Sequence, residues 1–319
     1  MNNKRNCLFC HRPLDSTHDR YHPQCSQRLF GHRIAPELPY GYNDLQKAAK
    51  KVVRSQVSVP GVQAKLSLNL EKSRKKNSRF TLVGLWGNFI LKPPVERYPH
   101  MPAIEHLTMH LASLFKIDTV QHGLIHLKSG ELAYITRRID RSSDGKKLHM
   151  EDMCQLTERL TEDKYRGSME QIGRIINRYS SNPLLDCIRF FDVTLFSFLT
   201  GNADMHLKNF SLIYPVDGMV QLSAAYDMLA TRLLISEKDD PEEMALTVNG
   251  KKRKLTLDDF HQLAANLGMN QKQIKNIFKR FSKTLPTTGA VIDRGFLPDE
   301  KKYAFKQLIA ERTKRLNLL

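Results

Sequence analysis

The chain has 319 residues, of which 41% are hydrophobic and 26% charged, and 50 Lys and Arg against 33 Asp and Glu give it a net charge of +17. This length suffices for one large domain or two modest ones with real cores. The apolar runs are too short to span a bilayer and the first residues lack a signal-peptide core, so we expect a cytoplasmic protein with no membrane partner. The charge favours anionic partners, but the basic residues are scattered, which does not suggest a nucleic-acid-binding platform.

The first 38 residues are rich in Cys and His and poor in periodic apolar residues. Three of the five cysteines lie here, in the pattern Cys7-x2-Cys10-x11-His22-x2-Cys25. Two closely spaced ligand pairs around one loop are typical of a tetrahedral zinc site, whereas an odd number of cysteines argues against a disulfide framework. We predict a small zinc-knuckle-like module over residues 1–38 with a structural Zn²⁺. Thiols that cluster without a metal are the alternative reading, and three other histidines are alternates for His22: His11, His18 and His32.

Residues 39–138 are predicted to form a β-rich lobe with an inserted helix. Leu66, Leu68 and Leu70 alternate with polar neighbours, which indicates a half-buried strand. Pro102 is placed to open a helix at its first turn. The remaining elements expected here are a helix over 44–54 and strands over 80–83, 88–92, 120–127 and 131–139.

Residues 139–319 are predicted to be mostly helical, with short strands near 210–214 and 219–222. A β-rich part followed by a helical part predicts an α+β fold with two lobes and a cleft between them. The predicted domains are therefore 1–38, 39–138 and 139–319.

The stretch LTGNADMHLKNFSL, residues 199–212, places several kinds of polar side chain between two apolar segments. An acid followed five residues later by an amide, here Asp204 and Asn209, has the spacing of a kinase catalytic loop, in which the acid acts on the attacking hydroxyl and the Asn binds magnesium. A predicted hairpin then presents Asp227 as the second acid, and Mg²⁺ prefers such oxygen ligands. A helix-capping Asp204 and a surface Asp227 are the plain alternatives, but the complete set predicts a phosphotransferase.

Six stretches of the chain resemble the HipA/HipT family of bacterial serine/threonine kinases, the toxins of toxin–antitoxin pairs. They occur in the order expected for that family, and the short N-terminal region is similar to the HipT-like branch. The stretches are SVPGVQAKLSL (58–68), NFILKPP (88–94), ITRRIDR (135–141), MEDMCQL (150–156), LTGNADMHLKNFSL (199–212) and LSAAYDM (222–228).

The resemblance implies a two-lobed protein-kinase-like fold that binds ATP and Mg²⁺. It implies that Asp204 is the catalytic base, that Asn209 and Asp227 hold magnesium, and that Lys92 grips the ATP phosphates. Glu105 on the following helix is either the partner of Lys92 or an exposed helix-start residue. The remaining residues implied in ATP binding are Val59, Pro60, Gly61, Val62, Gln63, Ala64 and Lys65 of a phosphate loop, Arg137, Arg138 and Ile139 of a hinge, and His206, Leu207, Lys208 and Tyr226.

Ser58, just before the phosphate loop, matches the family's autophosphorylation site, and Ser55 is the nearest rival acceptor. The two acids of the MEDMCQL stretch, Glu151 and Asp152, are explained if they cap the N-terminus of a helix. Cys154 and Cys187 are expected to be small core residues.

These observations predict a toxin that phosphorylates a protein substrate, such as an aminoacyl-tRNA synthetase. By resemblance its partners are a helix-turn-helix antitoxin and, as in the short branch of the family, a small third protein, with DNA contacted only through the antitoxin. Two alternatives stay open: a small-molecule kinase of the same superfamily, and a DNA-binding regulator suggested by the Cys/His module and the net charge.

Overall fold

The structure is a computed structural model, which describes residues 6–15, 18, 20–55, 63–71, 78–84, 86–142, 145–216 and 218–318, with backbone only for 51–55. The chain divides into two compact units. The first comprises Met1–Leu107, Val120–Arg138 and Arg294–Leu297, and the second comprises Thr108–Thr119, Ile139–Asp293 and Pro298–Leu319. Among the described residues, no helix combines the length and apolar character needed to cross a bilayer.

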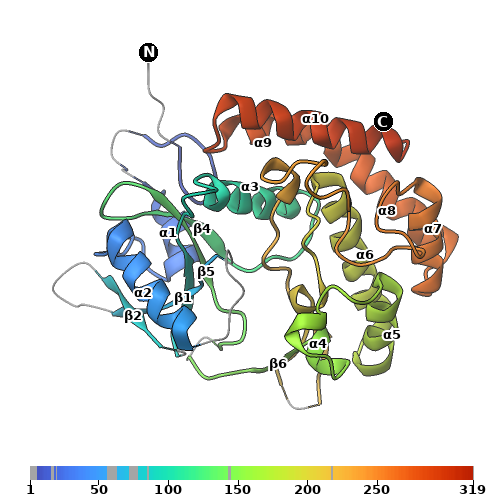
Figure 1. Cartoon of the computed structure of the whole chain (residues 1–319), viewed down its shortest axis with the longest axis horizontal. Helices are drawn as coiled ribbons and strands as arrows, with labels where there is room; N and C mark the ends of the chain where they lie inside the picture. Colours follow the sequence, from blue (N-terminus) through green and yellow to red (C-terminus); the bar gives the residue numbers. More distant parts are fainter. Residues whose placement is uncertain are drawn as a thin grey trace. The chain divides into compact units, whose positions relative to one another are not determined.

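The first unit is built on a five-stranded sheet in the order β2-β1-β3-β5-β4, with every neighbouring pair antiparallel. Strands β1, β2, β4 and β5 of this sheet are labelled in Figure 1. Its strands are β1 (Leu66–Glu71), β2 (Arg79–Val83), β3 (Phe89–Lys92), β4 (His122–His126) and β5 (Leu132–Arg137). The predicted strands are therefore present, several of them shorter than the sequence suggested. Leu66 and Leu68 are buried, as their alternation with polar neighbours predicts.

Three helices accompany this sheet: α1 (Pro23–Phe30), α2 (Tyr42–Ser55) and α3 (Met101–Leu114), whose last turns belong to the second unit. Helix α1 was not predicted, because eight residues are too few for a clear apolar period. Its boundaries nevertheless have local causes, since Pro23 is the first helical residue and Gly31 ends the helix at a left-handed φ of 80°.

The second unit is mostly helical, as predicted. Its helices are α4 (Met153–Leu156), α5 (Met169–Tyr179), α6 (Pro183–Thr200), α7 (Leu257–Asn266), α8 (Gln271–Thr284), α9 (Thr288–Arg294) and α10 (Asp299–Arg315). A small sheet has the order β6-β7-β8, with β6 (His149–Asp152), β7 (Ser211–Tyr214) and β8 (Gln221–Leu222). From Phe190 to Thr200 every residue of α6 is buried, so this helix is the central support of the segment that follows it.

Candidate active site and candidate metal centre

The catalytic-loop stretch begins where α6 ends. Gly201 terminates the helix with a left-handed φ of 67°. The amide nitrogen of Asn209 then donates to the carbonyl oxygen of Asp204 over 2.8 Å. The backbone N–H of His206 donates to the same carbonyl at 2.9 Å, so the loop folds back on itself. The acid and the amide that sequence spacing singled out are thus brought together, and the amide oxygen of Asn209 is the atom suited to a cation.

The segment that carries Asp227 is tied to this loop on both of its sides. The hydroxyl of Tyr226 donates to the carbonyl of Lys208 at 3.0 Å and lies 2.6 Å from the hydroxyl of Ser211. Thr231 accepts a hydrogen bond from the N–H of Ala203 at 2.9 Å. Asp227 itself has a left-handed φ of 60°, a strained conformation that is common at functional sites.

Asp152 is a support that the sequence did not reveal. Its carboxylate forms an ion pair with Lys208 at 2.6 Å, across 56 residues of sequence. The same carboxylate caps α4, where it and Gln155 form a reciprocal capping box. The N-capping predicted for Asp152 is therefore correct but incomplete. Glu151 instead lies in strand β6 and accepts a hydrogen bond from Tyr214 at 2.8 Å.

Tyr165 is a second neighbour of the loop that the sequence did not reveal. Its hydroxyl donates to Oδ1 of Asp204 at 2.7 Å, and its ring packs edge-on against His206 with centroids 5.1 Å apart. Burial and the adjacent Asp204 carboxylate raise the pKa of Tyr165, so the phenol stays protonated and can keep donating. Sequence spacing gave no sign of this contact, because the two residues are 39 positions apart.

The loop also contains two buried polar atoms that are available to bind a ligand. Nδ1 of His206 and Nδ2 of Asn202 are buried and lack a hydrogen-bond partner within the part of the chain that the structure describes. Burial lowers the pKa of His206, which favours the neutral imidazole. Buried polar atoms are usually satisfied, so a bound phosphate, metal or water is a natural partner for them.

In the first unit, Lys92 and Glu105 form a buried ion pair. Their charged atoms are 2.5 Å apart, and the two side chains are only 6% and 1% exposed. The Lys92 ammonium also lies 5.3 Å from the centre of the Tyr134 ring. The pairing of Lys92 with Glu105, rather than an exposed Glu105, is therefore correct.

The predicted phosphate loop lies only partly within the described residues. Ser58, Val59, Pro60, Gly61 and Val62 lie outside the described residues. Gln63 donates to the carbonyl of Pro93 at 3.0 Å, and Ala64 and Lys65 lead directly into β1.

At the predicted hinge, the N–H groups of Arg137 and Arg138 already donate to the carbonyls of Gln121 and Asn88, at 2.8 and 2.9 Å. Adenine recognition by either N–H would have to replace one of these bonds. Of the other predicted residues, Ile139 is half-buried and belongs to the second unit, and Leu207 is buried.

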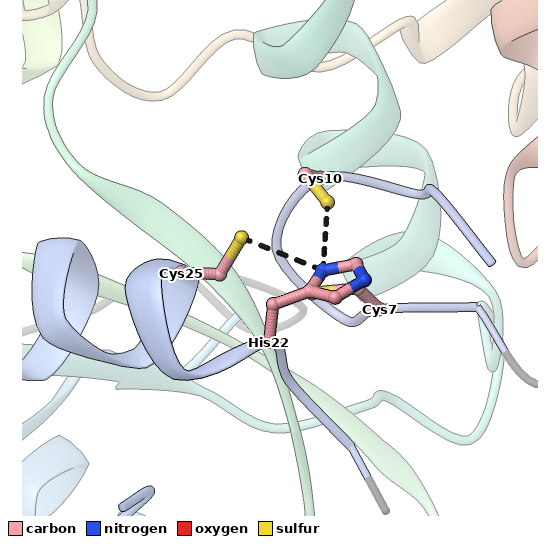
Figure 2. A group of neighbouring side chains, drawn as sticks. All are labelled: Cys7, Cys10, His22 and Cys25. Carbon is pink, nitrogen blue, oxygen red and sulfur yellow. Dashed lines mark hydrogen bonds between the residues drawn. The ribbon is translucent and has the colours of Figure 1, made fainter. Parts of the chain in front are cut away.

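The Cys/His cluster, defined as Cys7, Cys10, His22 and Cys25, is a separate site in the first unit. One ligand atom from each side chain lies within 4.8 Å of all the others. Figure 2 shows the side chains converging, with Cys25 on the first turns of α1 and His22 at its N-terminal end. The three thiols are unbridged. His11, His18 and His32, the alternates considered for His22, are outside the group.

The dimensions of the cluster fit a tetrahedral metal. Nδ1 of His22 lies 3.5 Å from the sulfur of Cys10 and 3.8 Å from that of Cys25. Metal–ligand distances of about 2.3 Å to sulfur and about 2.0–2.1 Å to nitrogen in tetrahedral geometry place such atoms about 3.5–3.6 Å apart. Nε2 of His22 is 3.1 Å from the carbonyl of Pro13, so an Nε2–H donor leaves the Nδ1 lone pair facing the thiols.

The thiols also perturb one another. Hydrogen bonds from the side chains of Cys10 and Cys25 lower the pKa of Cys7, whereas the side-chain hydrogen bonds with Cys10 and Cys7 raise the pKa of Cys25. Zinc binds cysteine in its deprotonated form, so metal binding at this cluster would release the thiol protons.

A mixed α+β architecture, an internal Lys–Glu pair and the predicted Asp–Asn catalytic loop followed by a second Asp are the features of a protein-kinase-like fold. The solved structures that share it include the following two. The HipA chain of a Shewanella oneidensis toxin–antitoxin complex of HipA, HipB and operator DNA matches with a TM-score of 0.66 at 21% identity, over 82% of this chain and 65% of that one. The Helicobacter pylori proinflammatory kinase CtkA matches with a TM-score of 0.55 at 14% identity, over 79% and 94%. The predicted fold class is confirmed.

The chain belongs to the family of the HipA-like C-terminal domain, whose family model matches residues 57–288. A relative from Haemophilus influenzae named "Putative kinase" is 29% identical over 316 residues, covering 89% of this chain and 88% of the relative. The serine/threonine-protein kinase toxin HipA of Shewanella oneidensis is 25% identical over 261 residues, covering 73% of this chain and 56% of the toxin. The HipA resemblance is thus confirmed, while membership of the HipT-like branch stays a prediction.

Proposed function

We propose that this protein is an ATP- and magnesium-dependent serine/threonine protein kinase. The observation that carries the proposal is the hydrogen bond between the amide of Asn209 and the backbone of Asp204, in a loop to which the Asp227 segment is tied. Family membership supports it, and relatives in the family are named kinases.

In the proposed reaction, the bond between the β,γ-bridging oxygen and the γ-phosphorus of ATP breaks while a hydroxyl oxygen bonds to that phosphorus. Asp204 takes the hydroxyl proton, and ADP leaves. The carboxylate of Asp204 already accepts a hydrogen bond from the Tyr165 hydroxyl at 2.7 Å, which is the kind of contact that this role requires. Magnesium, when bound, neutralises charge on the phosphates, and the oxygens of Asn209 and Asp227 are its proposed ligands. Lys92 is the proposed phosphate-binding cation.

We further propose that the kinase is the toxin of a toxin–antitoxin pair in the cytoplasm and phosphorylates a translation component such as an aminoacyl-tRNA synthetase. The toxin name of one relative and the HipB-bound complex of a structural neighbour support this role. The proposed partners are a helix-turn-helix antitoxin and a small third protein, with DNA contacted through the antitoxin.

The test is phosphotransfer from labelled ATP by purified protein in a bacterial translation extract, with Asp204→Asn and Asp227→Asn as variants. Each variant should lose about three orders of magnitude in rate or more, because electrostatic positioning carries most of this chemistry. Wild type should also arrest growth when expressed alone and be harmless with the antitoxin. Near-normal transfer by both variants would refute the kinase, and label only on small molecules would favour a small-molecule kinase instead.

We also propose autophosphorylation at Ser58. A phosphoserine adds roughly −1.5 to −2 charge at a predicted phosphate loop, so it would compete with ATP phosphates. Mass spectrometry after incubation with ATP should find phosphate on Ser58 in wild type and none in Asp204→Asn. Phosphate on Ser55 alone would contradict the assignment.

A further inference from the structure

We infer that the Cys/His cluster binds one zinc ion, and that this ion holds together the whole first unit, including the strand that ends in Lys92. The inference does not depend on the proposed kinase activity. It depends on how the cluster is connected to the sheet.

The donor set selects the metal. Three sulfurs and one imidazole nitrogen, all within 4.8 Å of one another, suit zinc, whereas magnesium and calcium require oxygen ligands. Four protein ligands fill the coordination shell, which is the arrangement of structural zinc rather than of catalytic zinc.

The ion would join two short segments that are weak on their own. Cys7 and Cys10 lie in a turn closed by the hydrogen bond from the N–H of His11 to the carbonyl of Cys7 at 3.0 Å. His22 and Cys25 lie at the start of α1, which has eight residues. Isolated helices shorter than about 12–15 residues are marginal in water, so α1 needs tertiary support.

The turn side of the cluster covers the outer edge of β4. Leu8, between the two cysteines, accepts a hydrogen bond from the N–H of Leu124 at 2.9 Å, and its own N–H donates to the carbonyl of Arg20 at 2.9 Å. The hydroxyl of Tyr21 donates to the carbonyl of Leu124. Both backbone groups of Leu124 are therefore satisfied by the segment around the cluster, and an exposed edge strand is avoided.

The helix side of the cluster is part of the core of the sheet. Leu29 and Phe30 belong to the same buried cluster as Leu66, Phe80 and Phe89. The Phe30 ring lies 5.8 Å from that of Phe80 and 6.3 Å from that of Phe89. Helix α1 approaches β4 so closely that a Cβ on Gly123 would lie 2.6 Å from a methyl of Leu29.

This packing reaches the strand of Lys92. Phe89 and Leu91 of β3 lie in the core shared with α1, whereas Lys92 is paired with Glu105 of α3. Because side chains alternate along a strand, Lys92 projects from the opposite face to Phe89 and Leu91. Loss of the ion should therefore loosen α1, then the β4 edge and the face of β3 that backs Lys92.

The experiment uses the full chain purified without chelator. We expect one zinc per chain, a fall in melting temperature of about 10 °C or more after chelation, and its recovery on adding Zn²⁺. Hydrogen exchange locates the effect, because chelation should speed exchange of the Leu124 amide at least about tenfold. The exchange rates of the α6 amides, in the second unit, are measured in the same experiment. Unchanged α6 rates would show that the loosening stays in the first unit. Faster exchange throughout the chain would show global unfolding, which also fits the inference.

Variants provide the control. Cys25→Ser should bind less than about a tenth of a zinc per chain, whereas Cys187→Ser, which changes another buried thiol outside the cluster, should keep one. If Cys25→Ser does not fold, chelation of wild type gives the same measurement. Less than about a tenth of a zinc in wild type, iron in its place, or an unchanged Leu124 exchange rate after chelation would overturn the inference.

Discussion

The Cys/His cluster and the catalytic loop both gather polar side chains, but they are assembled from different distances along the chain. All four cluster residues fall within positions 7–25. The proposed catalytic loop is local in Asp204 and Asn209, the residues to which we assign the chemistry. It is not local in its supports, since Lys208 and its partner Asp152 are 56 residues apart. A site whose ligands are close in sequence can be found from spacing, whereas the residues that hold a loop in shape cannot.

The ion pairs of the two units differ in how deeply their side chains are buried. The side chains of Lys92 and Glu105 are 6% and 1% exposed, whereas those of Lys208 and Asp152 are 34% and 15% exposed. Breaking a fully buried pair leaves a charge in a poorly solvating environment, but water can compensate for a partly exposed one. The first pair should therefore matter for stability and the second mainly for loop geometry.

The largest expected effect is that of Lys92→Met. It leaves the buried Glu105 carboxylate without its cation and should lower the free energy of unfolding by about 3–5 kcal/mol, measured by chemical denaturation. Lys92→Met combined with Glu105→Leu should recover much of that loss. The control is Arg79→Ala, which breaks a pair in the same sheet whose side chains are 61% and 50% exposed, and which should cost under about 1 kcal/mol. Equal losses in both single variants would show that burial does not distinguish the pairs.

Lys208→Met should have a smaller effect on stability, about 1 kcal/mol or less, because water reaches the pair with Asp152. Its effect on phosphotransfer should be larger, about tenfold or more, since a small displacement of a catalytic group is costly. Lys252→Met, which breaks the 3.1 Å pair with Glu242 in the same unit, is the matched control and should keep full activity. If both variants have equal rates, the pair with Asp152 does not position the loop.

Tyr165→Phe should change phosphotransfer by at most about tenfold, the equivalent of one hydrogen bond of about 0.5–1.5 kcal/mol. It removes the 2.7 Å bond to Asp204 but keeps the ring contact with His206. Tyr179→Phe, a change at another partly exposed tyrosine, is the control. The difference between the steady-state rates of the two variants gives the contribution of the Tyr165 hydroxyl. A loss of several orders of magnitude would instead make Tyr165 part of the chemistry.

The smallest effect should be a pH dependence of stability from His206. Burial lowers its pKa in the folded state, so near and below pH 6.5, its usual unfolded value, the unfolded chain binds more protons. The free energy of unfolding should consequently fall as pH drops through this window and level off below the folded pKa. The free energies of unfolding from denaturation curves at pH 5.5 and 7.5 should differ less for His206→Gln than for wild type. An equal difference in both proteins would contradict the idea that burial of His206 lowers its pKa.

Much of the fold was predictable because its signals are local. Alternating leucines indicated β1, and Pro102 indicated α3. Helix α1 was missed because its stability comes from packing of Leu29 and Phe30 rather than from an apolar period. The prediction of hinge residues could not take backbone pairing into account. Spacing along the chain cannot show that the N–H groups of Arg137 and Arg138 already have backbone partners.

The sequence by itself determined the chemistry that this chain can offer: three thiols and a histidine at ligand spacing, and an acid, an amide and a second acid around a hairpin. Those patterns depend on residue type and separation along the chain, which folding does not change. Tertiary structure alone decided that His22 is the histidine facing the thiols, that Glu105 is buried against Lys92, and that Asp152 and Tyr165 contact the loop that contains Asp204. These are contacts between distant segments, and their partners are selected by the packing of the whole unit rather than by any local preference of the chain.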